Sequence, residues 1–455
     1  MPAAETGADP ALPMAIIGVV LIVTFVFIAF EKLHKSLAAL LGAVVAVALA
    51  LFLGVYGPET GYNAVHSFIS HDLGVIGVIV GTSILVEVVG GSGLFHFLAM
   101  RLVKLTRGDP RLLLPAVMAA TVAFVTFLTI APGVLIMSSL VLVITRALDD
   151  DPVPYIMAVA IGANSGALMT FASGIPTLMI GTSANIPYVH FLMVSLPLAL
   201  VSAVLAFVMI RLFYGGRLGV GLGQQALADR RRKVAGFDEW ALVKDRRIFI
   251  RCALILALTI AGFATAQQLG VGLDFVAIAG ATAALLFSGF DPGQAIQKVK
   301  WPIILFFVGL FVLIGTVSET GLIELMARQL FAVTGTDMML AVILLVPFVF
   351  VTAAIVDNIP VAATMIPVVQ TMIGEGLAAE PLWWALIAAC NLGGNPTPVG
   401  SIAAVIALHA LERERGIRIG WGEYMKVGGS IALLQIGLVI VYIWGFWVFG
   451  LFPAL

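Results

Sequence analysis

The residues best suited to chemistry in this chain are amides, hydroxyls and one carboxyl, all placed inside apolar stretches. Asp357, followed by Asn358, lies within the apolar run 338–372 and is the most deeply placed acid. An ionisable side chain in such a run is costly and marks a functional site by default. Desolvation favours the neutral form of a carboxyl, as a reversible proton carrier needs. We therefore predict that Asp357 and Asn358 couple proton movement; the alternative is a structural acid that caps a half-helix.

Two polar segments, 164–177 and 390–401, interrupt other apolar runs with glycine and proline, and neither contains Lys or Arg. Such breaks free backbone groups that lipid cannot satisfy, so they must pack in protein or line a wet cavity. The absence of Lys and Arg from both segments counts against a dedicated binding site for a carboxylate or phosphate. It suits a neutral polyol-like solute or a small cation. The alternative is that these breaks only let helices pack closely. The substrate-binding candidates are Thr129, Asn164, Ser165, Thr170, Thr177, Asn391, Asn395, Thr397 and Ser401.

Composition places these segments in a membrane. Hydrophobic residues make up 61% of the 455 residues, charged residues 11%, and the mean hydropathy is +1.12, whereas soluble domains carry about a quarter charged residues. Apolar runs such as 12–30 and 36–56 are long enough to cross roughly 30 Å of hydrocarbon as helices. The sequence predicts an all-α polytopic membrane protein with about ten transmembrane helices, some of them broken. The lipid bilayer is thus an expected partner.

The distribution of basic residues predicts the orientation. Ten of the 24 Lys and Arg residues fall between Arg211 and Arg251. Because cytoplasmic loops of membrane proteins are enriched in Lys and Arg, we predict that the central loop 215–247 lies in the cytoplasm and that the chain is multi-pass in the inner (plasma) membrane. Nucleic-acid binding explains this cluster less well, and no nucleic-acid partner is expected.

Four landmarks recur at a constant spacing of 227 or 228 residues, which indicates an internal repeat. The pairs are Gly93 and Gly321, Pro132 and Pro360, Asn164 and Asn391, and Thr170 and Thr397. The enrichment of Lys and Arg in cytoplasmic loops predicts that the two copies begin on opposite sides of the membrane. The repeats are therefore expected to be inverted, as in transporters with a substrate site at the membrane midplane. The expected regions are N-terminal helices (1–72), a first repeat (73–214), a basic linker (215–247), connecting helices (248–290) and a second repeat (291–455).

Several motifs resemble the ion transporter superfamily, in its arsenite permease, P-protein and sodium/proton antiporter branch. They are the run from Glu31 to Gly42, Arg107-Gly-Asp-Pro-Arg111 and Val356-Asp-Asn-Ile-Pro360, in that order. Thr397-Pro-Val-Gly-Ser401 is closest to the arsenical-pump membrane proteins, the arsenite efflux permeases. The resemblance implies a scaffold part and a transport part with two re-entrant hairpins and two broken helices. It also implies export of arsenite and antimonite coupled to proton entry.

The leading expectation is therefore a secondary transporter that exchanges neutral arsenite or antimonite trihydroxides for protons. The alternatives are a sodium/proton antiporter and a carrier of anions such as dicarboxylate or sulfate. An enzyme is not expected: the sequence has no HExxH, and an intramembrane aspartyl protease would need a second buried aspartate beside Asp357. No P-loop is present, so a soluble ATPase, if one assists, would be a separate partner. No cofactor or bound metal is expected.

Overall fold

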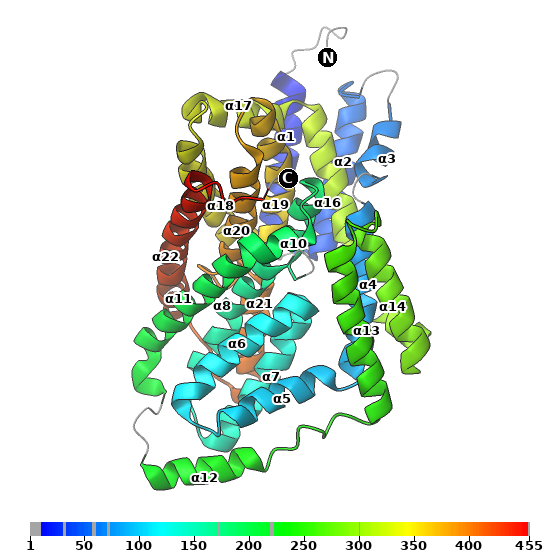
Figure 1. The fold of residues 1–455 in the computed structure, drawn as a ribbon. Helices are drawn as coiled ribbons and strands as arrows, with labels where there is room; N and C mark the ends of the chain where they lie inside the picture. The colour runs from blue at the N-terminus through cyan, green and yellow to red at the C-terminus, as the bar shows by residue number, and fades with distance from the viewer. Residues whose placement is uncertain are drawn as a thin grey trace.

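The computed structural model describes residues 11–30, 33–56, 61–70, 73–170, 173–218, 223–299 and 301–453. In this part of the chain every regular element is a helix (Figure 1). In chain order the helices are α1 (Ala11–Ala29), α2 (Lys35–Phe52), α3 (Asn63–Ser70), α4 (Leu73–Gly91), α5 (Leu94–Leu105), α6 (Pro110–Leu128), α7 (Ile130–Leu148), α8 (Val153–Met169), α9 (Ile175–Ser183), α10 (Tyr188–His190), η1 (Phe191–Ser195), α11 (Leu196–Tyr214), η2 (Gly215–Arg217), α12 (Gln224–Ala235), α13 (Arg246–Thr265), α14 (Leu273–Ser288), α15 (Pro292–Gln297), α16 (Trp301–Glu319), α17 (Leu322–Thr334), α18 (Met338–Val356), α19 (Asn358–Gly374), α20 (Ala379–Leu392), α21 (Ile402–Arg415) and α22 (Trp421–Val448).

Ten helices among the described residues are long and apolar enough to cross a membrane. This confirms the predicted class, an all-α polytopic membrane protein. Many of their large apolar side chains face outward, such as Val44 and Leu433, which are 65% and 73% exposed. In water this surface would be unfavourable, whereas in lipid it is the ordinary lateral face of a spanning helix.

Four of the helices form two hairpins with very tight tips. Thr129 alone joins α6 to α7, and Asp357 alone joins α18 to α19. Both tip residues have positive φ, 69° and 109°, a conformation that non-glycine residues rarely adopt. A Cβ added to Gly133 would lie 3.2 Å from the Val125 backbone nitrogen, so α7 begins by folding back along α6. These are the re-entrant hairpins that the family resemblance implies.

The two halves have the same plan. The series from α4 to α9 recurs from α16 to α21, with equivalent helix starts: Gly93 and Gly321 precede α5 and α17 with φ of 83° and 79°. The Asp109 and Asp337 side chains cap α6 and α18. Figure 1 places α5 and α17 at opposite ends of the molecule, so the two halves are inverted.

The halves exchange helices in the scaffold part, by which we mean α1, α2 and α4 with α13, α14 and α16. The helix α2 packs along α16 of the other half, and α14 packs along α4. Glycine permits both close approaches: a Cβ on Gly309 would lie 2.7 Å from the Ala39 backbone, and one on Gly81 would lie 2.5 Å from Ala277. The transport part comprises α6 to α11 and α18 to α22.

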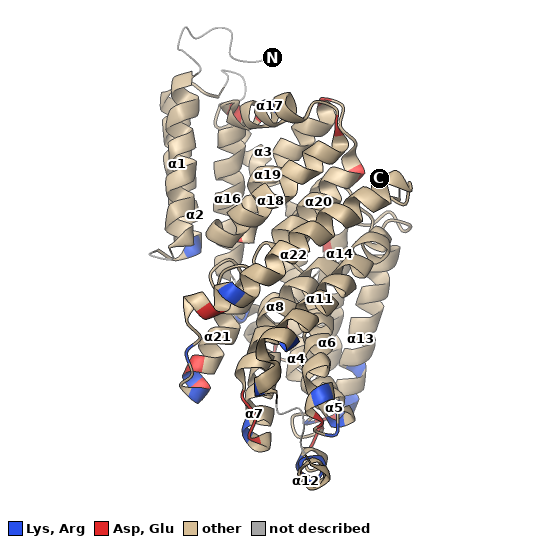
Figure 2. Ribbon diagram, turned by 90° about the vertical axis from the view of Figure 1, so that its left-hand side faces the viewer, with Lys and Arg blue, Asp and Glu red and all other residues tan. Residues whose placement is uncertain are grey.

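The two ends of the molecule differ in charge. In Figure 2 most Lys and Arg lie toward the end that carries α5 and α12, where Asp and Glu also occur, whereas the opposite end near α17 shows mainly Asp and Glu. The helix α2 begins about midway between these ends (Figure 2). Its first residue, Lys35, therefore lies at the depth of the hairpin tips rather than at either surface.

Candidate functional site

A cavity of about 80 Å³ lies where both hairpin tips meet α9, the start of α21 and the scaffold helices α4 and α16. Most of its wall is apolar, including Ile79 and Ile303. Its polar side chains are Thr82, Ser83, Thr129, Ser173 and Asn358. No charged side chain is among the described residues that line it, so specificity must come from hydroxyls, an amide and backbone groups.

Four helices begin at this cavity. The first residues of α7, α9, α19 and α21 all line it: Ile130, Ile175, Asn358 and Ile402. The first turn of a helix presents unpaired N–H groups and a partial positive charge. Each of α7, α9 and α19 has a proline in its first turn, and in α21 the Ala403 N–H is accepted by Ser401. The N–H groups that remain and the positive field suit a solute rich in oxygen acceptors.

Asp357 sits beside the cavity in the tip of the second hairpin and is only 3% exposed. Its Oδ2 atom accepts a hydrogen bond from Lys35 Nζ at 2.8 Å, across the boundary between the transport part and the scaffold. Its Oδ1 atom is buried and has no hydrogen-bond partner among the described residues. The carboxyl thus has one oxygen held by a cation and one oxygen able to receive a proton.

Sequence reasoning missed Lys35 as a site residue. It considered basic residues only within the two polar breaks, whereas the cation comes from the first residue of α2, 322 positions before Asp357. A signal was present, because Lys35 belongs to the Glu31 to Gly42 run that carries the family resemblance. Glu31 and Lys32 of that run lie outside the described residues.

Most of the predicted amides hold the two halves together instead of facing the cavity. The Ser401 hydroxyl donates to Asn164 Oδ1 at 2.8 Å, and Asn164 Nδ2 donates to Asn395 Oδ1 at 2.8 Å. Asn395 Nδ2 then donates to Gln435 Oε1 at 2.8 Å. The chain of bonds ends at Ser202 and Ser165. These six side chains, which we call the polar bridge, are at most 1% exposed.

Gln435 and Ser202 were also missed by sequence reasoning. Gln435 is an isolated amide in the long apolar stretch of α22, and Ser202 lies in α11. A polar residue in the interior of a spanning helix is itself a signal for a buried hydrogen bond. The bond between Gln435 and Ser202 could not be deduced, because it joins residues 233 positions apart in opposite halves of the chain.

Asn391 forms a second link between the halves. Its Nδ2 atom donates to Thr177 Oγ1 at 2.7 Å and to the Ile387 carbonyl at 2.8 Å. Its Oδ1 atom is buried without a partner among the described residues, directly under Gly174, where a Cβ would lie 2.8 Å away. Gly174 lines the cavity. Asn391 is thus the predicted amide with an acceptor left just behind the cavity wall.

Two further predicted hydroxyls, those of Thr397 and Thr170, bond to backbone. Thr397 donates to the Ala354 carbonyl at 2.6 Å, tying the second break to the second hairpin. Thr170 donates to the Thr126 carbonyl at 3.3 Å, the corresponding link in the first half. Residues 171 and 172, within the first break, lie outside the described residues. Of the residues predicted to bind substrate or couple protons, Thr129 and Asn358 line the cavity directly, and so does Ser173 of the first break.

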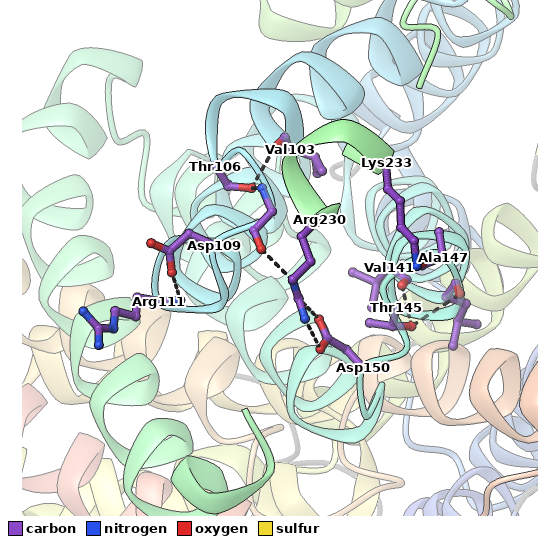
Figure 3. A network of polar contacts seen from close by, with 12 residues as sticks. Val103, Thr106, Asp109, Arg111, Val141, Thr145, Ala147, Asp150, Arg230 and Lys233 are labelled. Carbon is purple, nitrogen blue, oxygen red and sulfur yellow. Dashed lines mark hydrogen bonds and ion pairs between the residues drawn. The ribbon is translucent and has the colours of Figure 1, made fainter. Parts of the chain in front are cut away.

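A separate network holds the base of the first hairpin (Figure 3). Arg230 of α12 is 8% exposed; its Nε atom donates to the Gly108 carbonyl at 2.8 Å, and its Nη1 atom donates to Asp150 Oδ1 at 2.9 Å. Its Nη2 atom pairs with the other Asp150 oxygen. Gly108 precedes α6 and Asp150 follows α7, so one guanidinium fastens both ends of the hairpin. Lys233 adds a bond to the Ala147 carbonyl at 3.1 Å.

Inverted repeats, paired re-entrant hairpins and a central cavity between broken helices define a multi-pass membrane transporter. The comparisons with known proteins agree. A profile described as citrate transporter (CitMHS) matches residues 25–389, and the chain belongs to this family, within the ion transporter superfamily.

Relatives extend along nearly the whole chain. A 46 kDa membrane protein of Mycobacterium leprae is 29% identical over 443 residues, covering 95% of this chain and 98% of that protein. The human P protein is 26% identical over 498 residues; they cover 92% of this chain but only 58% of that protein. In fold the chain is similar to the YdaH transporter of Alcanivorax borkumensis, with a TM-score of 0.61, 15% identity and coverage of 92% of this chain and 99% of that one.

Proposed function

We propose that this protein is a proton-coupled secondary transporter of a small, oxygen-rich solute, and that it exports arsenite and antimonite as neutral trihydroxides. The observation that carries the proposal is the cavity with four helix N-termini and no charged side chain among its described lining residues. Backbone N–H groups and the Thr129 hydroxyl can exchange hydrogen bonds with a trihydroxide without burying a net charge.

Cavity size supports a small solute. One water needs roughly 10–15 Å³ of cavity space, and the cavity offers about 80 Å³. A single metalloid atom with its hydroxyls fits such a volume, whereas a tricarboxylate would need the hairpins to separate. The family name therefore does not by itself fix the substrate of this chain.

Asp357 is the proposed proton carrier, with Asn358 beside it in the tip of the second hairpin. The Asp357 Oδ1 atom, which has no hydrogen-bond partner among the described residues, is the oxygen that would receive the proton. Because Asp357 lies next to the cavity, binding of the proton and binding of the solute would each favour a different position of the hairpin. Asn391, Asn395, Asn164, Ser165 and Ser401 act indirectly in this proposal, by holding the two broken helices in register. Thr170, Thr177 and Thr397 do the same through their backbone and side-chain bonds.

A small anion, such as sulfate or a dicarboxylate, is a second candidate. The four helix N-termini favour it, since each is worth about 0.3–1 kcal/mol toward a negative charge, and up to about 2 kcal/mol when partly buried. The same positive field opposes a sodium ion in this cavity, so sodium/proton exchange is the least favoured alternative.

The orientation is part of the proposal. The end that carries α5 and α12 has most of the Lys and Arg, and the positive-inside rule assigns it to the cytoplasm of the inner (plasma) membrane. The linker 215–247 then faces inward, where a soluble ATPase partner would have access to it. The boundaries 73–214 and 291–455 remain the proposed limits of the repeats.

Flux measurements on the purified chain in liposomes separate the candidates. Under an imposed pH gradient, the proposal expects accumulation of arsenite and antimonite that collapses when the gradient is removed. Accumulation of labelled sulfate or dicarboxylate without metalloid flux would establish the anion carrier instead. Sodium-driven proton movement without solute flux would contradict both.

A further inference from the structure

The ion pair between Lys35 and Asp357 is the one salt bridge in the described chain that joins the scaffold part to a hairpin tip. The carboxylate is almost fully buried, with 4% of its side chain exposed, whereas the Lys35 side chain is 29% exposed. Lys35 therefore supplies the compensating charge for this carboxylate, because a buried charge left without its partner is strongly destabilising. The ammonium, in contrast, retains access to solvent.

The neighbouring helices bring no competing charge to the pair. The helices α1, α9, α18 and α19 have no titratable side chain, and α16 has only Glu319 at its far end. His34, next to Lys35, shares a hydrogen bond with Ser36 at 2.7 Å. The titratable groups on the other helices packed against this hairpin are Glu324 and Arg328 of α17, Glu380 and Cys390 of α20, and Glu423, Tyr424, Lys426 and Tyr442 of α22. None of these groups bonds to Asp357 within the described residues.

The pseudo-symmetry of the fold shows that this pair is not required for folding the hairpin itself. The equivalent tip residue of the first hairpin is Thr129, and the first residue of α14, equivalent to α2, is Leu273. The first hairpin thus makes the same tight turn without an ion pair. The charges at the second tip are an addition to a fold that does not need them.

We propose that Lys35 is an electrostatic latch that holds the second hairpin against the scaffold and releases it when Asp357 takes up a proton. The incoming proton binds a carboxylate oxygen of Asp357; Lys35 keeps its own proton and turns toward solvent. The attraction across the boundary then disappears, and the transport part can move relative to α2. This inference rests on the proposed proton coupling, but it is independent of which solute is carried.

A distance measurement tests the latch without any solute. Spin labels at Leu41→Cys in α2 and Ile355→Cys in α18 report on the scaffold and the hairpin, and both positions are lipid-facing, at 47% and 62% exposed. The native Cys252 and Cys390 are buried. In the parent chain, mild acidification should change the ratio of the two distance populations by about tenfold, which lies within the usual range of coupling between two linked equilibria. In Lys35→Met the ratio should already be that of the acidified parent and no longer respond to pH.

Control variants separate a latch from a structural role. Lys35→Arg keeps the charge and should keep the pH response, and Lys35→Met with Asp357→Asn leaves no unpaired charge and should be folded and unresponsive. Lys298→Met removes a lysine between α15 and α16 that pairs with Glu87 of α4, away from both hairpin tips, and should behave like the parent. A parent chain with no pH response, or a Lys35→Met variant with the parent's response, would overturn the latch. If the latch responds as expected but no metalloid flux is found, the proposed substrate fails and the latch stands.

Discussion

The two hairpins have the same backbone design but are fastened at opposite ends. The α6–α7 hairpin has a neutral tip, Thr129, and its base is bound by Arg230 of α12. The α18–α19 hairpin has a charged tip, Asp357, bound to the scaffold through Lys35. Within the described residues no ion pair holds its base, 334–337 and 374–378. An inverted repeat alone would make the hairpins equivalent, so these added charges assign them different tasks.

We infer that the first hairpin is the fixed wall of the cavity and the second is its proton-sensitive gate. The buried bonds at the base of the first hairpin resist motion relative to α12. The bond at the tip of the second can be broken by one proton. Each of the substitutions described next tests one part of this difference between the two hairpins.

The largest expected effect is at the tips. Asp357→Asn removes the carboxyl that binds the proton, and we expect a roughly 100-fold loss of pH-driven accumulation, against less than about fivefold for Thr129→Val, given typical coupling free energies. Thr129→Val should instead raise the KM for solute, because its hydroxyl lines the cavity. Accumulation ratios in liposomes measure both. Equal losses in the two variants would show that the tips are functionally equivalent.

The base of the first hairpin should dominate stability. Arg230→Ala leaves Asp150 buried without its cation and should lower the free energy of unfolding by about 3–5 kcal/mol. Lys298→Ala breaks an exposed pair with Glu87 and should cost at most about 1 kcal/mol. Thermal unfolding in detergent compares them. If Arg230→Ala is as stable as Lys298→Ala, α12 does not fix the hairpin.

The polar bridge should respond more weakly. Asn164→Ala leaves Asn395 and Ser401 each without one bond, a loss of about 1–3 kcal/mol per buried group. Ser165→Ala, next to it, removes only the bond to Ser202 and should cost about 1 kcal/mol. Both variants should keep pH-driven accumulation if they fold. Loss of coupling at unchanged stability would place Asn164 in the transport step itself.

The sequence alone predicted which segments form the site, but not which way their side chains face. The repeat at 227 or 228 residues, the all-helical fold, the two breaks and the unusual Asp357 follow from composition, spacing and helix breakers, which are local properties. Which way an amide faces depends on partners far along the chain. Asn164 bonds to Asn395, 231 residues away, so both turn from the cavity.

The electrostatics of the site were out of reach for the same reason. The lack of Lys and Arg in the breaks suggested an uncharged site, but Lys35 reaches Asp357 from the other half of the fold. The positive field of four helix N-termini also arises only once α7, α9, α19 and α21 converge. The two hairpins were expected only from the family resemblance. The apolar run 338–372 alone is equally compatible with one long helix.

The most direct test of the account is simultaneous measurement of proton and solute flux through the purified chain in liposomes with the membrane potential clamped. The account predicts that arsenite entering the vesicles moves protons outward in a fixed ratio. In Asp357→Asn, arsenite should still exchange with arsenite across the membrane, and proton movement should cease. Proton flux that follows arsenite in Asp357→Asn as it does in the parent chain would contradict the central claim that this hairpin tip carries the coupling.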